Sequence, residues 1–431
     1  MIKKLKKTKQ KAWIIDVNMG YGHQRTAYPL TDLAPNKKII SANDYKGIPK
    51  KDKVIWDSSK RFYEFISRFK KVPIIGEFGF SIFDKFQRIL VFYPKRDLSN
   101  PNLYLKQVFG LIKKGWGKDL IKKLSKNPLP LITTFFIPAF MAEAFNYPAD
   151  IFCVICDADI SRSWAPLNPF QSKIKYFAPN FRVMERLMLY GVKEENIFLI
   201  GYPLPKENIK NSSKDLAYRI LNLDTKKRYQ RKYKPLIKAF LGSLPKKSNH
   251  PFAITFAVGG AGVQKEIAIK ILKNLSLKIK KGEIKIFLIA GIREEVNKYF
   301  LENIKRLGLE SSLNKNIEII YEENIRDYFK KFNQVLRKTD ILWTKPSELS
   351  FYTALGLPII LAPTVGSQED FNEEWLLRLG SAMRQKDLKY LDQWLPDFMD
   401  SGWFAEAGMQ GFIEAKRLGT YEIEKIISKK T

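Results

Sequence analysis

His23 is one of only two histidines in a chain of 431 residues, and two glycines, Gly20 and Gly22, stand just before it. A neutral imidazole can take a proton from a hydroxyl group near pH 7 or hydrogen-bond a phosphate oxygen. Residues 12–17 (AWIIDV) predict a buried strand, and the residues after His23 can open a helix. The glycines supply the φ freedom for a tight turn. The pattern predicts an imidazole held at a helix start, although a histidine with only a structural role in the turn fits it too.

Residues 256–266 (FAVGGAGVQKE) repeat this arrangement in the second half of the chain. Gly259, Gly260 and Gly262 lie between an apolar strand and a helix, where backbone N–H groups can approach a diphosphate. Such turns also occur without any ligand. The first turn does not match a dinucleotide fingerprint, because Arg25 occupies the third glycine position, and no P-loop sequence occurs in the chain.

Polar side chains follow another apolar strand in residues 341–363. Ser347 can cap the next helix, and Glu348 suits the positive end of the helix dipole. Residues 364–382 (TVGSQEDFNEEWLLRLGSA) then open a further helix with amides and carboxylates that can hydrogen-bond sugar hydroxyls. A solvated loop would have the same composition. The candidate sugar ligands are Gln368, Glu369 and Asn372.

Apolar strand-like runs alternate with helical ones along the whole chain, which predicts an α/β fold with parallel sheets. The expected architecture is two doubly wound Rossmann-like domains facing a cleft. We expect an N-terminal domain at 1–205, a C-terminal domain at 206–395, and C-terminal helices at 396–431 that cross back to the first domain. The predicted strands are 13–17, 38–41, 131–135, 151–155, 174–178, 197–200, 252–258, 284–290, 317–321, 341–344 and 358–362.

The composition limits the class of protein. The chain is 45% hydrophobic with a formal net charge of +31, which favours an anionic partner such as a lipid surface or nucleic acid. No nucleic-acid-binding module is recognisable, so we expect no nucleic acid partner. Cys153 and Cys156 lie in an apolar run without further metal-ligand spacing, which favours core packing and a reducing cytoplasm. We find no signal peptide and no membrane span.

The segment 61–124 is rich in aromatic residues and ends in a basic amphipathic pattern. A basic helix with a tryptophan on its apolar face suits the surface of a membrane, whereas an ordinary surface helix would bury that face in its own domain. The apolar positions at helical spacing are Leu105, Val108, Phe109, Ile112, Trp116, Leu120 and Leu124.

The order of these motifs resembles the GT-B glycosyltransferases. More narrowly, it resembles the branch that holds the lipid-linked N-acetylglucosaminyltransferase of peptidoglycan synthesis and the monogalactosyl- and glucosyl-diacylglycerol synthases. The turn GYGH, the stretch 157–204, and the motifs VGGAG, WTKPSELSFYTALGLPII and GSQEDFNEEWLLRLGSA follow in that family's order. In 157–204 the matching residues are Asp157, Asp159, Trp164, Tyr176, Gly191, Gly201 and Pro203.

The resemblance implies sugar transfer from a nucleotide-sugar, usually UDP-linked, to a lipid or membrane-associated acceptor. The reaction would invert the anomeric carbon without a metal ion or other cofactor. His23 would lie at the cleft, either as the base that activates the acceptor or as a hydrogen-bond partner of the acceptor or the diphosphate. Asp159 is a second catalytic candidate, and Gly20 and Gly22 would lie on the acceptor side. The expected donor-binding residues are Gly259, Gly260, Gly262, Lys345, Ser347, Glu348, Thr353, Gln368, Glu369 and Asn372.

The chain departs from the family pattern at the donor ribose. Thr353 stands where the family has a glutamate, and Glu348 could substitute for it. The basic insertion 226–247 has no family counterpart. Two alternatives to a glycosyltransferase stay open: a non-catalytic protein of this fold that binds a nucleotide or a glycan, and a nucleotide-sugar 2-epimerase. We expect a cytoplasmic protein attached peripherally to the inner face of the membrane.

Overall fold

The computed structural model describes residues 10–69, 89–257, 262, 264–364 and 366–429 of the chain. The chain forms two compact units. Unit 1 comprises Met1–Leu204, Val365–Asn372 and Leu418–Thr431, and unit 2 comprises Pro205–Thr364 and Glu373–Arg417. Within the described residues, no helix is long and apolar enough to cross a membrane.

Unit 1 is built on a six-stranded sheet in the order β2-β1-β3-β4-β5-β6, with every neighbouring pair parallel. Its strands are β1 (Trp13–Asp16), β2 (Ile40–Ser41), β3 (Leu131–Thr133), β4 (Ile151–Val154), β5 (Lys175–Ala178) and β6 (Ile197–Leu199). Its helices are α1 (Tyr21–Ala27), α2 (Lys50–Phe69), α4 (Leu103–Lys113), α5 (Lys118–Ser125), α6 (Phe136–Ala144), α7 (Phe181–Leu189) and α18 (Gly419–Ser428).

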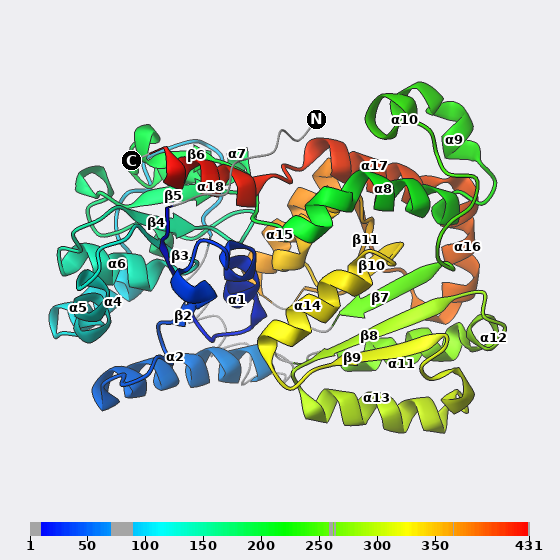
Figure 1. Ribbon diagram of the computed structural model, residues 1–431, viewed down its shortest axis with the longest axis horizontal. Helices are drawn as coiled ribbons and strands as arrows, with labels where there is room; N and C mark the ends of the chain where they lie inside the picture. Colours follow the sequence, from blue (N-terminus) through cyan, green and yellow to red (C-terminus); the bar gives the residue numbers. More distant parts are fainter. Residues whose placement is uncertain (1–9, 70–88, 258–261, 263, 365, 430–431) are drawn as a thin grey trace. The chain divides into compact units, whose positions relative to one another are not determined.

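Unit 2 contains a second six-stranded parallel sheet, in the order β12-β11-β10-β7-β8-β9 (Figure 1). This is the strand order of a dinucleotide-binding Rossmann fold, read from the other edge. Its strands are β7 (Ala253–Ala257), β8 (Lys285–Gly291), β9 (Ile317–Tyr321), β10 (Ile341–Thr344), β11 (Ile359–Leu361) and β12 (Ala382–Arg384). Its helices are α8 (Lys206–Leu223), α9 (Arg228–Lys232), α10 (Lys234–Leu241), α11 (Lys265–Asn274), α12 (Ser276–Lys280), α13 (Glu294–Arg306), α14 (Ile325–Leu336), α16 (Leu391–Ser401) and α17 (Trp403–Glu414).

The predicted fold class is confirmed, because both units are parallel sheets covered by helices. Each predicted strand is present, since fully buried strands of parallel sheets read as apolar runs. β9 and β10 have the predicted bounds, β8 is shifted by one residue, and the other strands are slightly shorter than predicted. β12 was not predicted, because it has only three residues and lies at a sheet edge. Of the C-terminal helices, α18 belongs to unit 1, whereas α16 and α17 belong to unit 2.

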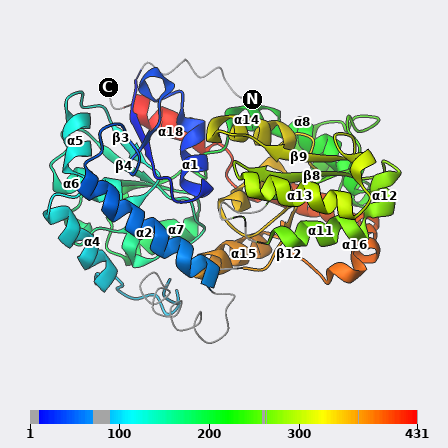
Figure 2. The same cartoon turned by 90° about the horizontal axis from the view of Figure 1, so that it is seen from below.

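The basic amphipathic pattern of unit 1 does not form one continuous helix. It breaks into α4 and α5, because Gly117 adopts a left-handed φ of +85° between them. Trp116 is buried, and its ring lies 4.7 Å from that of Trp56. Figure 2 shows α4, α5 and α6 together in this unit. The apolar positions Leu105, Val108, Ile112, Trp116, Leu120 and Leu124 are buried, as in an ordinary surface helix that packs on its own unit. Residues 70–88 of the aromatic stretch lie outside the described part of the chain, so membrane contact through the segment 61–124 stays a prediction.

Candidate functional site

His23 lies where the strand order of unit 1 changes direction. β1 and β3 are neighbours in the sheet, and the chain continues from β1 to the strand on one side of this pair and from β3 to the strand on the other side. Ligands of doubly wound sheets bind outside the carboxyl ends of strands at such a point. Gly20, with φ +100°, turns the chain out of β1 into α1 and places His23 in the first turn of that helix.

Two hydrogen bonds hold His23 to the end of β3. The Nδ1 atom of His23 lies 2.7 Å from the carbonyl oxygen of Thr134, and the Thr134 hydroxyl donates to the carbonyl of His23 at 2.9 Å. A carbonyl oxygen only accepts, so the proton of the neutral ring sits on Nδ1. Nε2 then carries the lone pair, which is the tautomer that a general base requires.

An apolar wall surrounds the imidazole. The Phe135 ring centroid lies 4.7 Å from that of His23, and the buried ring of Trp164 lies at 6.5 Å. The Sγ atom of Cys156 approaches His23 Nδ1 at 3.6 Å. Sequence reasoning missed Thr134, Phe135 and Cys156 as neighbours of His23. Only the β1-β3 and β3-β4 pairings bring these three segments together, although the TTFF run directly after a predicted strand was a usable signal.

Both cysteines are buried, in agreement with the predicted core packing. Cys153 lies within β4, and burial raises the pKa of its thiol well above the ordinary value. A thiol in that state is a poor nucleophile, so Cys153 contributes packing.

Asp159, predicted as catalytic, is committed to an ion pair. Its side chain is 2% exposed, and its two oxygens accept from Nε and Nη2 of Arg186 at 2.8 and 2.7 Å. It also accepts the backbone N–H of Ile160. Burial alone would lower the pKa of Arg186, but the hydrogen bonds and charge of Asp159 raise it overall. This geometry favours a structural role for Asp159, in fixing α7 to the loop after β4.

Asn372 is similarly occupied. Its side chain carbonyl accepts the backbone N–H of Ala158 at 2.7 Å, and its amide donates to Asp157 at 3.2 Å. With 1% of its surface exposed, it supports the loop after β4 and is not placed to bind a sugar hydroxyl. Gln368 and Glu369 lie half-buried in the first turn of α15 (Ser367–Leu379). All three belong to a segment grouped with unit 1, whereas the sequence predicted them in the C-terminal domain.

In unit 2 the strand order reverses between β7 and β10. The Thr344 hydroxyl at the end of β10 donates to the carbonyl of Ala257 at the end of β7, at 3.3 Å. The side chain amide of Gln264 donates to the carbonyl of Pro363 after β11 at 2.7 Å. These contacts gather the loops after three strands at one edge of the sheet. Gly259 and Gly260 lie outside the described residues, and Gly262 has φ +66° with Val296 packed closely against it.

The loop after β10 holds further predicted residues. Lys345, Ser347 and Glu348 are half-buried at the carboxyl end of that strand. The predicted helix is a 3-10 helix, η7 (Glu348–Leu355), and the predicted cap is wrong, because the Ser347 side chain makes no capping hydrogen bond.

Thr353 is not available to a ribose. Its side chain is 0% exposed, and Gly411 of α17 packs directly on it: a Cβ at residue 411 would lie 2.0 Å from the Thr353 hydroxyl. The predicted donor contact at Thr353 is therefore corrected. The 3-10 geometry of η7, which the sequence did not reveal, helps to set the direction of this side chain.

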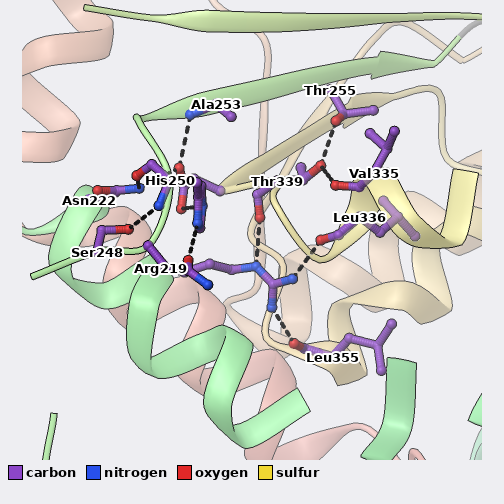
Figure 3. Close-up of polar contacts among 12 residues, drawn as sticks. Arg219, Asn222, Ser248, His250, Ala253, Thr255, Val335, Leu336, Thr339 and Leu355 are labelled. Atoms are coloured by element: carbon purple, nitrogen blue, oxygen red, sulfur yellow. Dashed lines mark hydrogen bonds and ion pairs between the residues drawn. The ribbon is translucent and has the colours of Figure 1, made fainter. Parts of the chain in front are cut away.

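The second histidine belongs to a buried polar network at the amino ends of β7 and β10 (Figure 3). Nε2 of His250 lies 3.1 Å from Asp340, which also accepts from Asn222 and from the backbone N–H of Ala253. Burial raises the pKa of Asp340 above its ordinary value. Because the strands are parallel, this network lies at the edge of the sheet away from the glycine turn, and its function is structural.

Cation ligands do not cluster in the part of the chain that the structure describes: no group of three or more His, Cys, Asp or Glu side chains there could hold a metal ion. The polar groups at the candidate sites are the His23 ring, hydroxyls, amides, Lys345 and the separate carboxylates of Glu348 and Glu369.

Comparison with known proteins identifies relatives. Residues 243–314 and 308–425 match a family model described as a domain of unknown function (DUF6938). A processive diacylglycerol beta-glucosyltransferase of Bacillus licheniformis is 22% identical over 325 residues, which covers 72% of this chain and 71% of the relative. The enzyme of the same name from Bacillus pumilus is 21% identical over 393 residues, 87% of this chain and 83% of the relative. Among solved structures, the crystal structure of Acinetobacter baumannii MurG aligns over 97% of this chain and 99% of that chain, with a TM-score of 0.48 and 13% identity. The sequence comparison confirms the predicted similarity to lipid glycosyltransferases of the GT-B class and the predicted enzyme class.

Proposed function

We propose that this relative of the diacylglycerol glucosyltransferases moves a sugar from a nucleotide-sugar, expected to be UDP-linked, to the hydroxyl of a lipid or membrane-associated acceptor. The observation that carries the proposal is the contact between His23 Nδ1 and the Thr134 carbonyl. This contact sets the imidazole tautomer at the edge of the sheet where doubly wound folds bind ligands.

The proposed reaction is a single displacement. The acceptor hydroxyl gives its proton to Nε2 of His23 while its oxygen forms a bond to the anomeric carbon. The bond from that carbon to the diphosphate breaks, its electron pair leaves with the nucleoside diphosphate, and the anomeric centre inverts. The imidazolium that forms still donates from Nδ1 to Thr134, and the ring of Phe135 limits water around it.

The proposed donor site is the carboxyl edge of the unit 2 sheet between β7 and β10. Its strand order and glycine turn support diphosphate binding by backbone N–H groups, with Lys345 offsetting the charge of the leaving group. Ser347 and Glu348 are proposed at the nucleoside. Gln368 and Glu369 remain proposed contacts of the donor sugar.

A comparison of His23→Asn with Thr134→Val tests the proposal. The assay follows transfer from UDP-glucose to diacylglycerol in mixed vesicles, with UDP binding measured by thermal shift. We expect His23→Asn to lower kcat by about 10²- to 10⁴-fold with an unchanged UDP-induced shift. Thr134→Val removes the hydroxyl but keeps the carbonyl that accepts from Nδ1, so its kcat should fall by less than about tenfold.

Equal losses in the two variants would mean that the position of α1, and not the base, limits the rate. Full activity of His23→Asn would refute the proposed role of His23. A wild-type protein that shows neither a UDP-induced shift nor transfer would favour a binding protein of this fold.

A further inference from the structure

Residues 226–247 of unit 2, called the basic arm here, contain cations but no acidic residue. The arm includes α9 and α10, which project beside α8 and α17 in Figure 1. All of its cationic side chains are exposed: Lys226, Lys227, Arg228, Arg231, Lys232, Lys234, Lys238, Lys246 and Lys247.

The arm has a defined position on unit 2. Tyr229 of α9 and Ile237 of α10 are buried in the core of the unit. The buried carboxylate of Asp224, just before the arm, accepts the backbone N–H groups of Tyr229 and Gln230. The guanidinium of Arg231 donates to the carbonyls of residues 226 and 227. These anchors fix the backbone of the arm on unit 2 while its cationic side chains stay exposed.

Few carboxylates stand near this surface; Glu406 of α17 acts on Lys232 through its charge but forms no ion pair with it among the described residues. Elsewhere in unit 2 cations meet carboxylates, as in the pairs Lys285–Glu318 and Arg337–Asp215. Among the carboxylates that the structure describes, none forms an ion pair with a cation of the arm. A dense, unpaired cationic surface attracts a polyanion, and the attraction falls with added salt.

Apolar groups stand among these charges. Phe240, near the end of α10, is 45% exposed, and Leu236, Leu241 and Leu244 are only partly covered by the core. An exposed ring beside lysines suits the boundary between headgroups and acyl chains, where the ring enters the apolar layer and the ammonium groups meet phosphates.

We propose that the basic arm docks this chain on an anionic lipid surface. This inference takes the membrane-associated acceptor from the proposed function and assigns membrane attachment to unit 2. In the α4–α5 region of unit 1, by contrast, Leu105, Trp116 and Leu120 are buried, although Leu103 at the start of α4 is exposed.

The test compares two charge-matched variants of the full chain. The arm variant replaces Lys226, Lys227, Lys232, Lys234 and Lys238 by Gln. The control replaces the exposed lysines of the α4–α5 region by Gln: Lys106, Lys113, Lys114, Lys118 and Lys122. Co-sedimentation measures binding to two kinds of vesicle, one of phosphatidylcholine alone and one that also contains about 30% phosphatidylglycerol. Each measurement is made at low and at physiological salt concentration. UDP-induced thermal shift is measured in parallel.

We expect wild type and control to bind the anionic vesicles alike, and the arm variant to bind at least about tenfold more weakly. Phe240→Ser should weaken vesicle binding but not binding to heparin, a polyanion without an apolar phase. Equal losses in both lysine variants, or a larger loss in the control, would overturn the proposal. Tighter binding of the wild-type protein to heparin or RNA than to the anionic vesicles would also overturn the proposal. The thermal shift keeps failure of donor binding separate from failure of docking.

Discussion

The ion pair between Asp159 and Arg186 makes a quantitative prediction about stability. Both side chains are almost fully buried, at 2% and 0% exposure, and two hydrogen bonds join them. Asp159→Ala leaves the guanidinium in the interior without its carboxylate. Removing one partner of a buried pair costs about 3–5 kcal/mol, because the remaining charge is neither paired nor hydrated. Arg186→Met should cost a similar amount.

The double variant separates pairing from packing. With both charges removed, no ion is stranded, so Asp159→Ala/Arg186→Met should cost less than the sum of the single changes by about 2 kcal/mol or more. As a control, Lys37→Met removes an exposed ion pair with Asp32 in the same unit. This change should leave the urea concentration at the midpoint of unfolding unchanged. Urea unfolding followed by tryptophan fluorescence gives these free energies, and the transfer assay is run on each variant below its transition. The structural role assigned to Asp159 would be refuted if Asp159→Ala kept wild-type stability while transfer was abolished.

Two further changes test the corrected features of unit 2. Thr353→Ala should change the affinity for UDP by less than about twofold from the wild-type value, because the Thr353 side chain faces Gly411 and not solvent. A loss of affinity above about tenfold in a UDP titration would instead show that Thr353 belongs to the donor site. Burial raises the pKa of Asp340 in the folded state above its value in the unfolded chain, which is about 4. The protonated carboxyl therefore stabilises the folded state fully below about pH 4, and this stabilisation is lost as the pH rises through the folded-state pKa. Asp340→Asn should therefore flatten the pH dependence of the unfolding free energy above about pH 4, and parallel curves for variant and wild type would contradict this assignment.

The fold was predictable because parallel strands buried on both faces read as apolar runs. The run KIFLIAG at 285–291 needs no information from elsewhere in the chain to be recognised. The turn that carries His23 was predictable for the same local reason, since Gly20 requires a backbone conformation that few other residues adopt.

The contact partners of the site residues could not be predicted from the sequence to the same extent. Thr134 meets His23 across 111 positions of sequence, and only the order of the strands brings them together. Asp159 matched a motif of acidic residues, but the motif gave no sign that Arg186, on a later helix, would occupy both oxygens. Thr353 was predicted to contact the donor because it stands where the family has a glutamate on an α-helix. In this chain the segment is a 3-10 helix, and the Thr353 side chain is buried in the core.

The placement of α18 has a consequence for the biosynthesis of the protein. Ile423 and Ile427 of this helix complete the apolar core beside Ile14 of β1, and Gly419 lies against the backbone of Tyr202 so closely that a Cβ would not fit. Chains leave the ribosome from the N-terminus at about 5–20 residues per second. The sheet of unit 1 is therefore synthesised well before the helix that covers part of its core, and a nascent chain carries that apolar surface uncovered while all of unit 2 is being made. Unit 2, whose strands and helices lie between residues 205 and 417, can close first. Completion of the unit 1 core therefore waits for the last helix of the given sequence to be synthesised.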